Sequence, residues 1–350
     1  MIDYSEAPPV SIVLVNWNGK NLLKAHLPGL QRLDYPNYEV IVVDNASTDG
    51  SVEFVKNRYP EFKVIVNEEN LGTAEGSNVA IPYCRGKYIF WVSNDMEFDT
   101  RILNHLIKCC EADESIGICT VKMRCFREGR PVNELDSVGA NMDIFAFPVP
   151  RGINQIDRGQ YDKPAEVFFS FGGAMFIRRS VLDIVGGFDP EYLTLTDDID
   201  LSWRVRLAGY KVVVEPKAFL YHRMSATLGK THNRPQKRYL SERNTLRTLL
   251  KNYSTGYLFF ILPAYFVILL LEMLFYTCMG KWKMIRACWR AIYWNLNRLA
   301  KTQRMRKVIQ SYRIVPDSKI MSLMLKRSEK IRIFFDFLRH RKTKRWRSYF

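Results

Sequence analysis

Short apolar runs alternate with helix-like segments over the first hundred residues. Four runs are predicted to be strands, at residues 11–17, 39–43, 62–66 and within 87–99, and the runs at 39–43 and 87–99 are predicted to be buried. The segments between them are predicted to be helical, at residues 20–33, 51–59 and 79–85. Strands that alternate with helices at these spacings indicate βαβ units, an α/β fold and a parallel sheet.

Polar residues stand where each of these strands ends. They are Asn16, Asp44 with Asn45, Asn67 and Asn70, and Asp95. In an open α/β sheet, ligands bind outside the carboxyl ends of the strands. Each residue alone is more often a turn or capping residue, but four polar ends on one edge predict a binding site.

The chemistry of these residues suggests separate roles. Asp44 can accept a hydrogen bond from a nucleobase, and Gly72 and Gly76 let backbone amides approach a ribose or phosphate closely. Asp95 is a candidate ligand for Mg²⁺ or Mn²⁺, and His222 can add a nitrogen ligand. The sequence has neither a P-loop motif nor a GxGxxG motif.

The stretch from residue 168 to 222 concentrates chemistry in the middle of the chain. It contains a double glycine, Gly172-Gly173, and the acids Asp197, Asp198 and Asp200 just before a helix-like run with Trp203. A cluster of carboxylates among apolar residues is costly unless it binds a cation or shares protons. The plainer interpretation is an Asp-rich helix N-terminus.

Residues 100–165 say less. We expect a helix at 101–112, a strand at 117–124 and a turn at 127–130. The segment 144–163, rich in Gly, Pro and Arg, is predicted to be a mobile loop. It could order over a ligand or be a surface insertion.

Taken together and in order, these motifs resemble glycosyltransferase family 2, especially its rhamnosyltransferase-like and other surface-polysaccharide transferases. The resembling segments fall within about residues 10–225: VSIVLVNWNG, VIVVDNASTDGS, NLGTAEGSN, FWVSNDMEFD, the run from FSFGG to GYKVV, and FLYH. The resemblance implies a nucleotide-diphospho-sugar transferase fold of the GT-A type, with a mixed, mostly parallel sheet flanked by helices. It also implies an inverting mechanism, a nucleoside-diphosphate sugar donor, a glycan or lipid-linked acceptor, and Mn²⁺ or Mg²⁺.

The resemblance also implies site residues. Asp198 corresponds to the general base, and Asp95 and His222 to the metal-holding residues. The expected donor-binding residues are Asn16, Asp44, Asn45, Asn70, Gly72 and Asn94. The expected acceptor-binding residues are Gly172, Gly173, Asp197 and Trp203.

Two motifs depart from the family pattern. The DxD motif is Ser93-Asn94-Asp95, which leaves one protein carboxylate for the metal. The Glu-Asp pair is Asp197-Asp198, one methylene shorter at its first position, where Asp197 stands.

Charge is concentrated at the C-terminal end. Residues 281–350 hold 21 Lys and Arg against three acids, a net of +18, whereas residues 1–280 carry −2. A neutral body argues against an enzyme that acts on nucleic acid. Seven cysteines without a CxxC pair are typical of a reduced compartment, and the N-terminus lacks the features of a signal peptide.

The apolar run 257–279 is long enough to span a bilayer. The catalytic body must be cytosolic to meet sugar nucleotides, so a membrane span would place the basic tail outside the cell. Because basic residues tend to stay on the cytoplasmic side, we favour a re-entrant or interfacial segment. We expect a catalytic domain at 1–250, a membrane-inserted segment at 251–280 and a basic amphipathic tail at 281–350 on an anionic membrane surface, at the cytoplasmic face of the cell membrane. A solvated basic face or an RNA-binding tail is the alternative.

Three functions compete. The first is a membrane-associated, metal-dependent inverting glycosyltransferase. The second is a processive polysaccharide synthase, disfavoured because the chain has one apolar segment and no Gln-x-x-Arg-Trp motif. The third is a catalytically inactive membrane scaffold, against which the set Asp44, Asp95, Asp198 and His222 argues.

Overall fold

The computed structural model describes residues 7–127, 129–223 and 233–339. The basic run at residues 340–350, part of the expected membrane-surface tail, lies outside these ranges. The N-terminal part contains β1 (Val10–Asn16), α1 (Lys20–Gln31), β2 (Tyr38–Asp44), α2 (Ser51–Arg58), β3 (Lys63–Val66), α3 (Gly72–Ala80), the 3₁₀ turn η2 (Ile81–Tyr83), β4 (Tyr88–Val92), β5 (Met96–Phe98) and α4 (Ile102–Ala112).

The chain then becomes richer in strands. This middle part contains β6 (Ile116–Arg127), β7 (Arg130–Val138), β8 (Ala140–Met142), β9 (Pro148–Pro150), β10 (Ala165–Glu166), β11 (Ala174–Arg178), α5 (Arg179–Val185), the 3₁₀ turn η3 (Pro190–Tyr192), α6 (Asp197–Leu207) and β12 (Lys211–His222). The C-terminal part is helical, with α8 (Arg234–Asn252), α9 (Thr255–Cys278), α10 (Trp282–Asn297), α11 (Leu299–Ser311), α12 (Asp317–Ser322) and α13 (Glu329–Arg339).

Ten strands of the described residues form one sheet, in the order β10-β12-β6-β11-β4-β1-β2-β3, with β5 paired to β12 and β7 to β6. β1 pairs in parallel with β2 and β4, and β3 extends this parallel half. β11 is antiparallel to both β4 and β6. The mixed, mostly parallel sheet of a GT-A fold, expected from the sequence, is confirmed.

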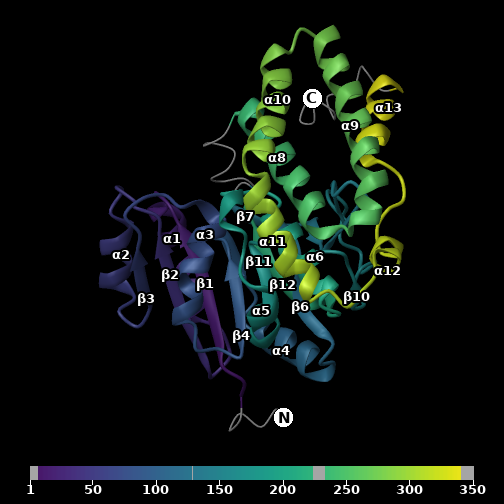
Figure 1. Ribbon diagram of the computed structural model, residues 1–350. Helices are drawn as coiled ribbons and strands as arrows, with labels where there is room; N and C mark the ends of the chain where they lie inside the picture. Colours follow the sequence, from purple (N-terminus) through teal and green to yellow (C-terminus); the bar gives the residue numbers. More distant parts are fainter. Residues whose placement is uncertain (1–6, 128, 224–232, 340–350) are drawn as a thin grey trace.

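Helices cover both faces of the sheet, because the buried strands are apolar on both sides (Figure 1). On one face, α1, α2 and α4 pack against side chains such as Ile12 and Val42. On the other face, α3, α5 and α6 pack against their alternating neighbours, such as Val13 and Ile41. A third cluster joins α6, at Trp203, to the C-terminal helices.

The C-terminal helices form a layer that projects from one end of the sheet domain (Figure 1). α8 packs against α6, α10 and α11, and α9 and α10 make a helical hairpin beside it. Residue 250, where we expected the catalytic domain to end, falls near the end of α8 (Arg234–Asn252). α9 is the one helix of the described chain that is long and apolar enough to cross a membrane.

The segment 144–163 differs from the expected mobile loop. It contributes β9, which pairs with β8, and its backbone bonds to β7 through Gln155 and Arg151. Asp157 pairs with Lys122 and Arg124 of β6. Apolar periodicity did not reveal this packing because long-range backbone hydrogen bonds and ion pairs provide it.

Candidate active site

Three residues at the carboxyl ends of adjacent strands form a hydrogen-bonded row. The parallel register sets Asn16 of β1 opposite Asp44 of β2, and the Asn16 Nδ2 donates to Asp44 Oδ2 at 2.9 Å. Asn94, just beyond β4, donates to Asn16 Oδ1 at 3.0 Å. The other Asp44 oxygen accepts from the backbone amide of Ser47. These three of the six expected donor-binding residues therefore lie together, and hydrogen bonds within the protein hold them in place before a ligand binds.

Asn45, Asn70 and Gly72 form a second group beside this row. The Asn45 amide donates to the Gly72 carbonyl at 2.9 Å and to Asn70 Oδ1 at 3.3 Å. Gly72 has a φ of +77°, and a Cβ there would lie 2.3 Å from the carbonyl oxygen of Leu193. We expected Gly72 to allow a ribose or phosphate to approach; the carbonyl of Leu193 occupies the place of its missing side chain, and donor contact at Gly72 stays a prediction.

Asp95 and His222, the expected metal-holding pair, face one another from different strands. β12 brings His222 opposite Met96, and its Nε2 lies 3.5 Å from Asp95 Oδ1. The Nδ1 of the same ring lies 2.8 Å from Asp136 Oδ2 on β7. Burial alone would lower the pKa of His222, but the carboxylates of Asp136 and Asp95 raise it to about 10. Burial would raise the pKa of Asp95, and His222 lowers it.

This donor set fits a hard or borderline divalent cation. A metal-binding histidine usually bonds a carboxylate through one ring nitrogen and presents the other to the metal, as Asp136 and His222 are arranged here. Asp95 adds a buried carboxylate oxygen. Among the residues that the structure describes, no three His, Cys, Asp or Glu side chains form a ready-made metal cage. The remaining ligands would therefore have to come from a bound diphosphate and water.

The double glycine connects this group to the carboxylate cluster of α6. Gly173 accepts a backbone hydrogen bond from Ser93 through its carbonyl, and a Cβ at Gly173 would lie 2.4 Å from the Ser93 Oγ. The Gly172 amide donates to Asp198 Oδ2 at 3.1 Å. The absence of a side chain at Gly173 lets this segment lie close to the end of β4, whereas a Cβ at Gly172 would make only an ordinary contact with Asp198.

Asp197 and Asp198 lie at the N-terminus of α6, and both resist ionisation. Burial raises the pKa of Asp198 to about 6, although amides of Gly172 and Ile199 bond its two oxygens and oppose the rise. Burial and then the charge of Asp198 raise the pKa of Asp197 to about 7. Asp198 keeps partial exposure, so a substrate hydroxyl can reach it. A carboxylate with these properties is well suited to accept a proton near neutral pH.

Asp200 and Trp203 are structural. Asp200 is fully buried and pairs with Arg204 at 2.9 Å and Lys251 at 3.0 Å. Trp203 has no exposed surface and stacks edge-on against Phe168 and Tyr253. We expected Trp203 to contact the acceptor; this is corrected, because its place on the inner face of α6 puts it in the core.

Sequence reasoning missed two residues beside the metal pair. Asp136 reaches His222 from β7, an element separated from it by 86 residues. His26 of α1 is buried and interacts electrostatically with Asp95. Neither of its ring nitrogens has a hydrogen-bond partner. Burial and then Arg223 lower the pKa of His26 to about 4. Neither residue lies in a recognisable local motif, so only the pairing of strands and helices reveals them.

Two family models match the chain. The model described as glycosyl transferase family 2 matches residues 11–185, which includes Asp44 and Asp95. A second, glycosyl transferase family group 2, matches residues 154–299 and includes Asp198 and His222.

Curated relatives include the poly-beta-1,6-N-acetyl-D-glucosamine synthases of Staphylococcus epidermidis, 22% identical over 231 residues, and Staphylococcus aureus strain MSSA476, 23% identical. Each alignment covers 65% of this chain and 53% of the relative, so the chain spans about half the length of these proteins.

Solved structures with the same fold include GalNAc-T7 with UDP, GalNAc and Mn²⁺ (TM-score 0.57, 16% identity, 70% of this chain and 48% of that one). Another is the mannosyltransferase PcManGT of Pyrobaculum calidifontis with GDP-Man and Mn²⁺ (TM-score 0.51, 17% identity, 89% and 87%).

Proposed function

The chain belongs to glycosyltransferase family 2, and from this premise we propose that it is a metal-dependent inverting enzyme that moves a sugar from a nucleoside diphosphate to an acceptor hydroxyl. The observation that carries the proposal is one connected path of hydrogen bonds. It runs from Asp44 through Asn16 to Asn94, and from the neighbouring Ser93 through Gly173 and Gly172 to Asp198. A donor-end acid and a base with a raised pKa are thus held in one rigid unit.

Each end of this path has a chemical role. Asp44, with one oxygen bound to Asn16 and the other to the Ser47 amide, is oriented to accept from a nucleobase. Asp198 accepts the proton of the attacking hydroxyl, and a base in that position contributes about 10²- to 10⁴-fold to the rate. A single direct displacement needs no carboxylate nucleophile on the enzyme, so the anomeric configuration inverts.

A divalent cation, when bound, supplies stabilisation of the negative charge that develops on the leaving diphosphate. Asp95 and His222 would hold it, and Asp136 orients the His222 ring by bonding Nδ1. Solved relatives of the same fold were crystallised with Mn²⁺ and with UDP or GDP-Man, which supports Mn²⁺ or Mg²⁺ and a nucleotide-sugar donor here.

We further propose that the acceptor is a lipid-linked or cell-surface glycan and that the enzyme works at the cytoplasmic face of the cell membrane. The apolar α9 and the basic C-terminal region support this location. Processive polysaccharide synthesis is the second candidate, because the curated relatives named above are synthases.

The test is a donor panel. Purified full-length protein is incubated with UDP-, GDP- and dTDP-sugars, with Mn²⁺ or with EDTA, and release of nucleoside diphosphate is measured. We expect one donor to be hydrolysed slowly in the presence of metal, and Asp95→Ala to abolish the release. Analysis of product length with the identified acceptor then separates single transfer from processive synthesis.

A further inference from the structure

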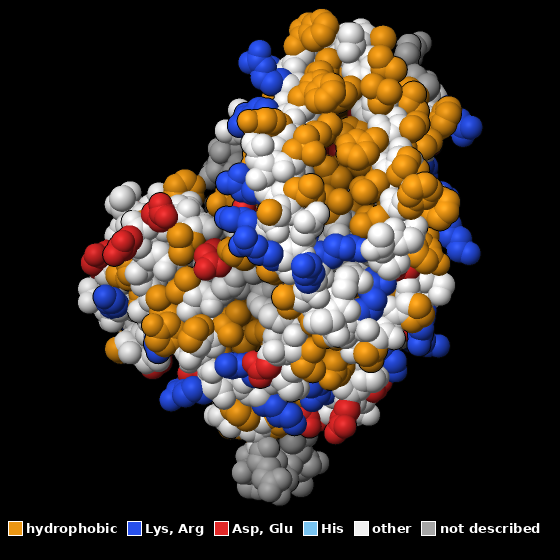
Figure 2. Space-filling view, in the orientation of Figure 1, with side chains coloured by type: hydrophobic (Ala, Val, Ile, Leu, Met, Phe, Trp, Pro, Cys, Tyr) orange, Lys and Arg blue, Asp and Glu red, His pale blue; other side chains and the backbone are white. Residues whose placement is uncertain are grey.

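The outer face of α9 is apolar along its whole length. Phe259 and Phe260 are 77% and 72% exposed, and the same face carries further exposed apolar residues: Phe266, Val267, Leu270, Leu271 and Leu274. They form the broad hydrophobic area in the upper part of Figure 2. Single exposed apolar residues are ordinary, but a continuous patch of this kind marks an interaction surface.

α10 continues this surface and borders it with positive charge. Trp282, Trp289, Tyr293 and Leu296 recur at spacings that place them on one face of the helix, and all are exposed. Lys283, Arg286 and Arg290 follow the edge of that face. The opposite side of α10, with Ala287, Cys288 and Ala291, is buried. Aromatic residues flanked by basic ones are typical of helices that lie at a membrane surface.

The inner face of α9 carries a charged network that argues against a membrane span. Its one acid, Glu272, pairs with Arg238 of α8 and lies 3.5 Å from Lys330 of α13. Both cations also pair with Glu242. If α9 crossed the bilayer, this charged network and the basic residues of α10 would be carried into hydrocarbon with it, at a large cost.

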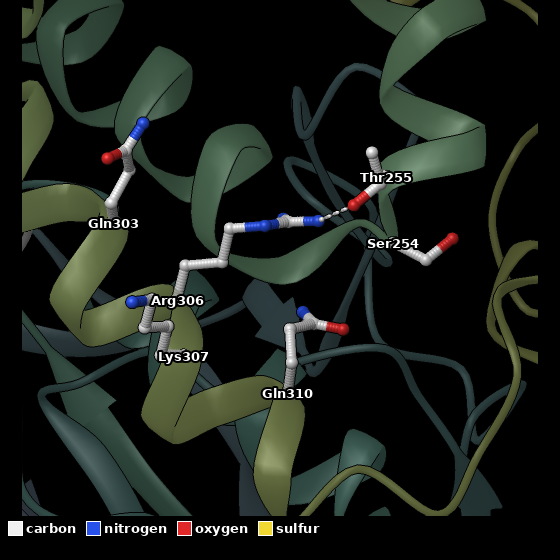
Figure 3. A pocket seen from close by; sticks show the side chains of 6 residues that line it. All are labelled: Ser254, Thr255, Gln303, Arg306, Lys307 and Gln310. Atoms are coloured by element: carbon white, nitrogen blue, oxygen red, sulfur yellow. Dashed lines mark hydrogen bonds between the residues drawn. The ribbon is translucent and has the colours of Figure 1, made fainter.

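A basic region lies at the base of the apolar surface. α11 presents Arg304 and Lys307, which are exposed and form no ion pair among the described residues. A cavity of about 510 Å³ opens there, lined by Ser254, Thr255, Gln303, Arg306, Lys307 and Gln310 (Figure 3). The Arg306 guanidinium is held by Thr255 and by backbone carbonyls of Leu250 and Tyr253. Its partner Thr255, the first residue of α9, lies one helical turn before Phe259.

From these observations we propose that the α9–α10 face lies along one leaflet of an anionic bilayer without crossing it, with the basic residues of α10 and α11 at the level of the lipid phosphates. Apolar side chains enter the acyl boundary, and the cations match the negative charge of the headgroups. The proposal deepens the membrane association of the proposed function and rests on it.

This arrangement would hold the catalytic base in a fixed place relative to the membrane. α8 lies between the membrane face and α6, and the buried pair of Lys251 with Asp200 ties it to α6. Lys251 also pairs with Asp189, the N-cap of η3. Asn252 adds a hydrogen bond to Asp200 at 3.1 Å. Asp198, two residues from Asp200, is therefore connected rigidly to the helices that meet the lipid.

The first test measures binding of the full-length protein to vesicles of phosphatidylcholine with or without phosphatidylglycerol. We expect binding to require the anionic lipid, and Arg304→Gln with Lys307→Gln to weaken it about 30-fold. Phe259→Ser with Phe260→Ser should weaken it at least tenfold. The control Ile184→Ser, an exposed apolar residue on α5, should bind like wild type. Binding that is independent of phosphatidylglycerol and is unchanged in both double variants would overturn the proposal.

The second test separates lying on the membrane from crossing it. Cys278, at the far end of α9, is exposed, whereas the other six cysteines are buried or partly buried. In a Cys109→Ser background, a membrane-impermeant maleimide added to intact spheroplasts should leave Cys278 unlabelled, and should label it after detergent lysis. Labelling in intact spheroplasts would show that α9 spans, and would overturn the proposal.

The outcomes also distinguish this proposal from the proposed function. Donor hydrolysis in detergent tests the transferase without lipid, so it can succeed while vesicle binding fails. If the protein does not bind vesicles and elutes as a dimer that Phe259→Ser with Phe260→Ser dissociates, a second copy covers the face and the membrane proposal is wrong.

Discussion

Replacing Asp198 by Asn tests the assignment of the base with almost no change of shape. In the wild type, one Asp198 oxygen accepts from the Gly172 amide and the other from the Ile199 amide. Asn offers one oxygen, so one of these amides loses its acceptor and faces an NH₂ group. A lost hydrogen bond of this kind costs about 1–3 kcal/mol of stability, which a folded domain of this size tolerates.

The expected loss of activity is larger and comes from chemistry. Asn cannot accept the acceptor proton, so kcat should fall about 10²- to 10⁴-fold. The pH profile gives an independent sign. Because the pKa of Asp198 is raised to about 6 and only the ionised form is a base, wild-type activity should decline as pH falls through 6. From pH 7 to pH 5 the ionised fraction of Asp198 drops from about 91% to about 9%, a loss of about tenfold.

The assay compares transfer rates of the two proteins from pH 5 to 8 at saturating donor and metal, together with thermal unfolding of each. The residual activity of Asp198→Asn should not decline as the pH falls through 6. If the variant is folded and keeps more than a tenth of wild-type kcat, or if its pH profile is unchanged, Asp198 is not the base.

Three further changes have expected outcomes. Lys251→Met removes the cation shared by two buried carboxylates and should destabilise the protein by about 3–5 kcal/mol, measured by chemical denaturation. Asp136→Asn weakens the hydrogen bond that orients the metal-binding imidazole of His222. It should reduce Mn²⁺ affinity about 10- to 100-fold, the usual effect of removing such a partner, as measured by calorimetry in the presence of nucleoside diphosphate. Gly173→Ala forces a Cβ against Ser93 and should cost about 1–3 kcal/mol, whereas Gly172→Ala, whose Cβ makes an ordinary contact, should leave stability nearly unchanged.

Each of these predictions can fail clearly. The control for the buried lysine is the exposed Lys56→Met, and equal stability of the two variants would refute the buried pairing. Unchanged Mn²⁺ affinity in Asp136→Asn would separate that carboxylate from the metal site. Equal effects of the two alanine variants would show that the close approach of Gly173 to the end of β4 is unimportant.

The pattern of the sequence predicted the parallel half of the fold well. Continuous apolar runs such as Val40–Val43 are buried on both faces and end in polar residues, so strand, burial and site edge follow from one local signal. Asp44 and Asp95 are found in this way. The antiparallel strand β11 depends on pairing with the distant segments β4 and β6, which periodicity does not encode. β7 pairs with the preceding strand β6 across residues 127–130, where a turn was expected.

The same limit explains the errors and omissions at the site. Trp203 follows the acidic residues in sequence, but 3.6 residues per turn carry it to the core side of α6. Gly72 looked accessible to a ligand, yet the loop at Leu193, 121 residues away, occupies its open side. Asp136 and His26 reach the metal pair only through tertiary structure.

Metal-dependent transfer from a nucleotide sugar is best tested by measuring nucleoside diphosphate release from a panel of UDP-, GDP- and dTDP-sugars by purified protein, with Mn²⁺ and with EDTA. We expect one donor class to be turned over, EDTA to stop turnover, added Mn²⁺ to restore it, and Asp95→Ala to be inactive although folded. Absence of both turnover and metal-dependent binding for every donor would refute the proposed function, and would favour an inactive scaffold that acts through its C-terminal helices.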